Sequence, residues 1–92
     1  MQQEIAETQA LALLAWLAGE EDILPVFMGA TGVGQDDLRA RAADPEFLAS
    51  MMDFLLMDDA WVLKGAEATG IPAENFALIR AGLPGGNLPN WT

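Results

Sequence analysis

Acidic residues are the side chains with the most evident capacity for chemistry, and they occur in clusters. Carboxylates grouped in this way could ligate calcium or magnesium, or act as a catalytic acid–base pair. No cluster has the alternating acidic pattern of a calcium-binding loop. Each instead precedes or opens an expected helix, where a carboxylate caps the helix and interacts favourably with its dipole. The clusters are Glu20–Asp22, Asp36–Asp37, Asp44 with Glu46, and Asp58–Asp59.

A second candidate is the glycine-rich segment Gly29–Gly34, which follows an apolar run and precedes an expected helix. In a dinucleotide-binding turn, such glycines let the backbone approach a pyrophosphate at a helix N-terminus. Here the spacing is G-x-x-G-x-G rather than G-x-G-x-x-G, and Asp36 and Asp37 would repel phosphates. The chain also lacks the strands for a parallel sheet. The segment therefore predicts the end of one helix and the start of the next.

The overall composition narrows the possible functions. Histidine and cysteine are absent, which removes the commonest general base, the commonest transition-metal ligand and all thiol chemistry. Fourteen acidic against four basic residues give a formal net charge of −10, which repels phosphate backbones and anionic lipids. Arg39, Arg41 and Arg80 fall in the last turns of expected helices, where a cation suits the dipole. We predict no cofactor and no metal, and neither nucleic acid nor a membrane as partner.

The segments at and near the N-terminus bear on localisation. Met1–Glu4 lacks the positive charge that opens a secretory signal. The longest apolar run, Ala10–Ala18, is shorter than the roughly 20 residues that cross a bilayer. A small domain without cysteines suits a reducing compartment. We therefore expect a cytoplasmic protein.

The elements that must position these residues are helices, because helical periodicity recurs along the chain and strand alternation is nearly absent. The sequence predicts an all-α fold, a compact bundle of about six short helices. The first helix is apolar almost all round in its second half and is expected to be the most buried. The expected helices are Gln3–Ala18, a helix from the acids at 20–22 to Thr31, Gln35–Ala42, a helix from Pro45 through Leu55, one from Asp58 to Gly70, and one from Pro72 to Gly82.

An internal repeat is suggested by the ends of two of these helices. Thr31-Gly32-Val33 maps onto Thr69-Gly70-Ile71 when the chain is shifted by 38 residues. Glycine after the last helical residue, followed by an apolar residue, is typical of a Schellman turn. The shift predicts two similar three-helix units, 14–43 and 52–81, within one domain spanning 1–84. Residues 85–92 are rich in glycine and proline and are expected to form a C-terminal tail.

The methionines and the tail are the candidate partner-binding features. Methionine-rich surfaces adapt to partner helices, although most methionines here also fall on expected core stripes. Tryptophan is favoured at binding hot spots, so the tail could bind another chain or pack on its own domain. The candidate partner-binding residues are Met51, Met52, Met57, Leu88 and Trp91.

One group of segments resembles a known family. Gly29–Arg39, Ala43–Leu48 and Asp53–Leu56, together with Ala68–Pro72, resemble an uncharacterised bacterial family, domain of unknown function 3572. The likeness covers nearly the whole chain. It implies a small helical protein of about this length, and it implies no catalytic residue because the family has no assigned activity.

These observations leave the function unknown but favour one hypothesis. We expect a small non-catalytic protein-interaction module, which offers an acidic helical surface or a Met- and Trp-lined groove to an unknown basic or helical protein partner. One alternative is a small-ligand or metal binder, or an enzyme, that works through converging carboxylates. Another is a homodimeric structural or assembly protein.

Overall fold

The computed structural model describes residues 1–85, which form six α-helices and contain no strand. The predicted all-α fold is confirmed, and most helix ends fall within one or two residues of their expected positions. Caps and stops set these ends locally, which is why the sequence locates them. The helices are α1 (Gln3–Ala18), α2 (Leu24–Thr31), α3 (Gln35–Arg41), α4 (Pro45–Leu55), α5 (Asp59–Thr69) and α6 (Asn75–Ala81).

The start of α6 is the largest departure from the expected helix ends. We expected this helix to begin at Pro72, but the α-helix begins at Asn75. The intervening residues form turns, in which the Asn75 N–H donates to the Pro72 carbonyl at 2.9 Å and the Phe76 N–H donates to the Ala73 carbonyl at 3.1 Å. Proline opens a helical turn here, but the tighter three-residue bonds delay the α-helix itself.

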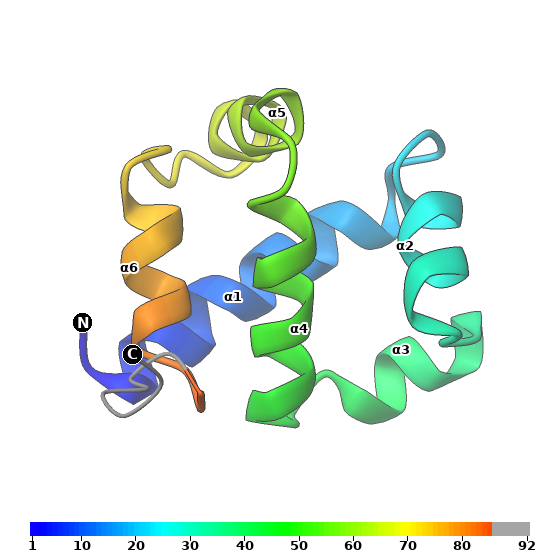
Figure 1. The fold of residues 1–92 in the computed structure, drawn as a ribbon, viewed down its shortest axis with the longest axis horizontal. Coiled ribbons are helices and arrows are strands. Elements are labelled where there is room, and N and C mark those ends of the chain that lie inside the picture. Colours follow the sequence, from blue (N-terminus) through cyan, green and yellow to red (C-terminus); the bar gives the residue numbers. More distant parts are fainter. Residues whose placement is uncertain (86–92) are drawn as a thin grey trace.

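Helices α1 and α4 form the centre of the structure. In Figure 1, α4 crosses in front of α1, with α5 and α6 on one side of the crossing and α2 and α3 on the other. Helix α1 packs extensively against α4, α5 and α6, and α4 also contacts α5 and α6, whereas α2 and α3 make sparser contacts. Arg80 joins α6 to α4, because its Nε donates to Asp53 Oδ1 at 2.7 Å.

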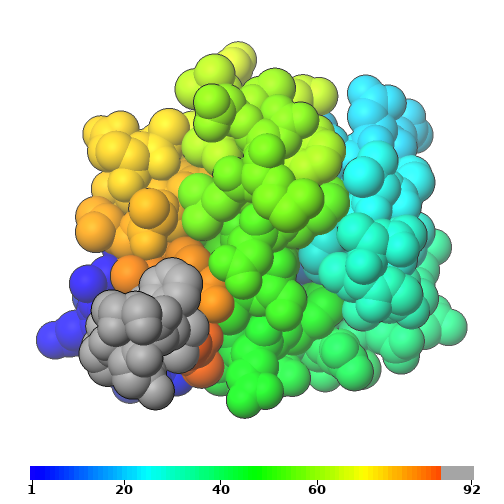
Figure 2. Space-filling model, viewed as in Figure 1, coloured from blue at the N-terminus to red at the C-terminus, as the bar shows by residue number. Residues whose placement is uncertain are grey.

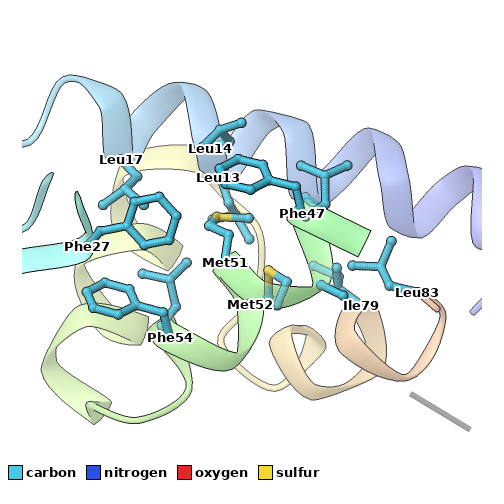
Figure 3. Close-up of a cluster of buried hydrophobic side chains, with 14 of the residues drawn as sticks. Leu13, Leu14, Leu17, Phe27, Phe47, Met51, Met52, Phe54, Ile79 and Leu83 are labelled. Carbon is cyan, nitrogen blue, oxygen red and sulfur yellow. The ribbon is translucent and has the colours of Figure 1, made fainter. Parts of the chain in front are cut away.

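A single cluster of buried apolar side chains fills the space between the helices (Figure 3). Helix α4 contributes seven of them, more than any other helix. The Phe27 ring of α2 meets Phe47 and Phe54 of α4 edge-on, with centroids 5.9 and 5.1 Å apart, and Phe54 stacks on Trp61 at 4.5 Å. Such pairs contribute about 0.5–1.5 kcal/mol each beyond the area that they bury. Aromatic contacts thus connect α2, α4 and α5.

Helix α1 is less buried than its sequence predicts. It buries one stripe of five residues, while Leu11, Ala12, Ala15 and Ala18 remain exposed. The expectation that α1 is the most buried helix is therefore wrong, because α4 buries seven of its 11 residues. Within residues 1–85, no helix combines the length and apolar character that a bilayer span needs.

The two threonine–glycine turns share the same hydrogen bonds. Gly32 and Gly70 adopt left-handed φ values of 74° and 79°, which favour glycine. Thr31 Oγ1 donates to the Phe27 carbonyl at 2.8 Å and accepts from the Val33 N–H at 3.3 Å. The equivalent bonds of Thr69 measure 2.7 and 3.2 Å. Both glycine N–H groups bond to the carbonyl four residues earlier, so these are αL caps rather than the expected Schellman turns.

The proposed repeat has only local support in this arrangement. The two glycine turns match, but α5 and α6 contact both central helices extensively, whereas α2 and α3 do not. One reason is that α1 has 16 residues and α4 has 11, so α1 is long enough to contact three helices. The division into two similar three-helix units stays a prediction.

Two glycines inside helices differ in their surroundings. A Cβ atom on Gly65 of α5 would lie 3.0 Å from Trp16, 3.3 Å from Phe76 and 3.4 Å from Leu13. A close helix crossing therefore explains this glycine, as its position inside a helix suggests. The same explanation is wrong for Gly29 of α2, since a Cβ there would meet nothing within 4 Å.

Substitution of these two glycines tests the closeness of the α1–α5 crossing. We expect Gly65→Val to lower the free energy of unfolding by about 2 kcal/mol, because the added methyl groups overpack the crossing. Gly29→Val is the matched control and should change it by less than about 0.5 kcal/mol. Urea unfolding followed by circular dichroism measures both. Equal midpoints for the two variants would contradict the crossing.

Candidate functional site

Three of the four acidic clusters accept backbone hydrogen bonds at helix starts, as their positions predict. Asp44 Oδ1 accepts a hydrogen bond from the Glu46 N–H at 3.0 Å at the start of α4. Asp58 Oδ1 accepts from the Ala60 N–H at 2.8 Å at the start of α5. Asp37 accepts a longer bond of 3.4 Å from the Gly34 N–H before α3. These carboxylates satisfy backbone N–H groups that the first helical turn leaves without partners.

The cluster Glu20–Asp22 has a different role from the expected cap. Helix α2 begins at Leu24 and has no side-chain cap, because residues 21–23 form a turn ahead of it. A carboxylate oxygen of Glu20 lies 3.4 Å from Nζ of Lys64. This ion pair connects the α1–α2 turn to α5. Both side chains are partly exposed, so the pair contributes at most about 1 kcal/mol.

Buried charge is absent from the part of the chain that the structure describes. None of the polar or charged side chains within residues 1–85 is buried. No group of three or more acidic, histidine or cysteine side chains in that range is placed to hold a metal ion. The described carboxylates therefore lie in solvent-accessible positions, and several have a structural role at helix starts.

The structure describes three of the five candidate partner-binding residues. Met51 and Met52 have no exposed surface and lie within the core beneath α1 (Figure 3), so their assignment to a partner surface is wrong. They occupy the inner face of α4, where an apolar stripe meets α1. Met57 is 76% exposed in the turn between α4 and α5. Leu88 and Trp91 lie outside the described residues.

A groove adjoining Met57 is the first candidate site. We call it the α5–α6 groove; it has a volume of about 470 Å³ and begins at Leu56, the residue before Met57. Figure 2 shows the surfaces of α5, in yellow-green, and α6, in yellow and orange, meeting on one face of the molecule. The apolar lining is flanked by one carboxylate from α5 and one from the turn before α6. The lining residues are Leu56, Asp59, Val62, Leu63, Ala73, Glu74 and Ala77.

The packing of α5 explains why this groove is apolar. Helix α5 approaches α1 through Gly65, the only residue that it buries fully. Its larger apolar side chains therefore stay nearer the surface: Val62 is half-buried and Leu63 is 61% exposed. The sequence does carry a signal for this site, because five of the eleven residues of α5 are glycine, alanine or threonine, which leaves few large side chains for the core.

A second apolar surface lies along α1 and α3, and we call it the α1–α3 face. It consists of two adjoining hollows of about 420 and 520 Å³, which share Leu11 and Ala42. The sequence predicted no site on this surface, because α1 was expected to be the most buried helix. The other residues that line it are Glu4, Glu7, Thr8, Leu14, Ala15, Ala18, Gln35, Leu38, Arg39, Ala43 and Leu48.

Residues 1–85 thus form a small all-helical fold whose surface carries the α5–α6 groove and the α1–α3 face. The family model described as "Protein of unknown function (DUF3572)" matches residues 3–86, and the chain belongs to this family. No curated protein and no solved structure matches the chain. The function of the family is unknown, so only the surfaces of this chain indicate what the protein binds.

The capping role of the acidic clusters can be tested at α5. We expect Asp58→Ala to lower the free energy of unfolding by about 1 kcal/mol, since it leaves the Ala60 N–H without its side-chain acceptor. Glu21→Ala is the control, because Glu21 is exposed and the same charge is removed; it should have little effect. Thermal and urea unfolding measure both variants. Equal losses would show that removal of charge, and not the cap, is responsible.

Proposed function

We propose that this protein is a small non-catalytic protein-interaction module that acts in the cytoplasm. In this proposal the α5–α6 groove binds a basic, amphipathic helical segment of a partner protein. The observation that carries the proposal is the groove itself, an apolar trough flanked by two carboxylates. Amphipathic helices commonly bind in such grooves through apolar residues one or two turns apart.

The apolar lining supplies the binding energy in this proposal. Leu56 and Leu63 are 37% and 61% exposed, and Met57, which follows Leu56 in the chain, is 76% exposed. Complete burial of one such side chain contributes about 1.5–3 kcal/mol, and the apolar residues of the peptide that enter the groove add a similar amount. Association costs several kcal/mol, so we expect the binding to be weak. Contiguous apolar surface of this kind commonly marks an interaction site.

Charge selects the type of partner. The two charged residues that line the groove, Asp59 and Glu74, are both acidic. Lys64, the basic residue of α5, is paired with Glu20 on another side of the helix. With a formal net charge of −10, the protein attracts cationic segments and repels nucleic acids and anionic membranes. We therefore favour a helix with one apolar and one basic face.

The same residues favour a peptide over a small ligand held by carboxylates. Asp59 and Glu74 are both exposed, and the apolar side chains between them make up most of the lining. A site for a metal or a small polar ligand would instead require converging carboxylates and further polar partners.

Binding of a model helix tests this function. The probe is an amphipathic peptide of about 18 residues with a leucine face and a lysine face. We expect amide shifts in a ¹⁵N NMR titration to lie in the α4–α5 turn, α5 and the start of α6. Leu63→Gln should weaken binding about tenfold, and the double variant Asp59→Asn with Glu74→Gln should reduce its dependence on salt.

Two controls make the titration decisive. Val26→Gln changes an exposed apolar residue of α2, 48% exposed, and should leave the affinity unchanged. A peptide with glutamate in place of lysine should not bind. The proposal is wrong if the glutamate peptide binds equally well, or if Leu63→Gln has no more effect than Val26→Gln.

A further inference from the structure

We propose that the α1–α3 face is the interface of a homodimer, in which α1 of one copy packs antiparallel to α1 of a second copy around Leu11. This inference concerns a surface that shares no residue with the α5–α6 groove. It adds to the proposed function and does not depend on it.

The composition of α1 supports this interface. No charged residue occurs between Glu7 and Glu20, a stretch that includes most of the helix. The other helices cover only one side of this stretch. On its other side Leu11 is 46% exposed, and Ala12, Ala15 and Ala18 are exposed as well. Helices that are apolar all round are normally covered on all sides. The outer side of α1 therefore has the composition of a contact surface.

The shape of the α1–α3 face also suits a second copy. The two hollows on this face share Leu11 and Ala42 in their linings and adjoin along α1, and we refer to the pair as a trough. Its floor contains Leu14 and Leu38, and the small side chains of Ala15 and Ala18 would let another helix approach closely. An exposed leucine at the centre of the trough can enter the equivalent hollow of a second copy, because a two-fold axis pairs each surface with itself.

Charge complementarity identifies a second copy as the occupant. One end of the trough carries Glu4 and Glu7, and the other carries Arg39. A partner of uniform charge would meet repulsion at one end. In the proposed dimer, a two-fold axis passes beside Leu11. Glu7 lies four residues before Leu11, so it faces Ala15 of the second copy, which lies four residues after Leu11. Arg39 of the second copy lines the same hollow as Ala15, so each Glu7 faces an arginine.

The formal charge of −10 on each copy opposes this association, but only weakly. The Debye length is about 8 Å at physiological ionic strength, so charges on the far sides of two copies are largely screened. A contact made by one helix and its neighbours is at the small end of specific interfaces. We therefore expect a dissociation constant of about 10–100 µM.

Sedimentation equilibrium of the full chain tests the dimer. We expect a monomer–dimer equilibrium between about 1 µM and 1 mM, and Leu11→Glu should shift it to monomer throughout that range. Leu78→Glu is the matched control, because Leu78 on α6 is 51% exposed, and it should leave the equilibrium unchanged. Circular dichroism confirms that each variant retains its helices.

A charge exchange tests the orientation of the two copies. Glu7→Arg and Arg39→Glu should each weaken the dimer about tenfold, and the double variant should restore most of the affinity. A wild-type chain that is monomeric at about 1 mM overturns the proposal. So does a dimer that survives Leu11→Glu, or a double variant no stronger than the single ones. Peptide binding at the α5–α6 groove is unaffected by any of these outcomes.

Discussion

The close packing of α1 against α4, α5 and α6 is the contact on which the rest of this structure depends. Small residues set the distance at which these helices meet. A Cβ atom on Gly65 would lie 3.0 Å from Trp16, and one on Gly82 would lie 2.9 Å from the Cβ of Ala6. Larger residues at either position would move α5 or α6 outward. Because the core is close-packed, such a shift would also disturb the aromatic contacts that hold α2 in place.

The small size of the protein explains why this packing leaves apolar surface exposed. A chain of 92 residues buries a smaller fraction of its surface on folding than a larger domain does. Three helices pack along one side of α1, and its other side remains accessible beside α3. The close approach of α5 through a glycine has a similar consequence, since it leaves Leu63 at the surface. Both candidate interaction surfaces thus follow from how α1 is packed.

The acidic residues divide into structural and surface roles. Asp44 and Asp58 accept backbone hydrogen bonds at helix starts, where their positions in the sequence predict them. Asp59 and Glu74 flank the apolar α5–α6 groove, while Glu4 and Glu7 lie at one end of the α1–α3 face. Some of the acidic residues therefore stabilise helix ends locally, and others lie beside the two surfaces that we propose as binding sites.

Local signals in the sequence predict the six helices and most of their ends. Caps such as Asp58 and left-handed glycines such as Gly70 act on backbone groups within a few residues, so local order along the chain is sufficient to read them. The predicted start of α6 was wrong, because the turns that precede this helix depend on hydrogen bonds that are just as local as those of a helix start.

The burial of individual apolar residues depends on tertiary packing. Met51 and Leu11 both lie on apolar stretches of helices, yet one has no exposed surface and the other is 46% exposed. Periodicity shows that a helix has an apolar face, but burial depends on which helices pack against that face and how closely. Those contacts join residues far apart in the chain, so local pattern alone does not show which further apolar residues, such as Leu11, stay exposed.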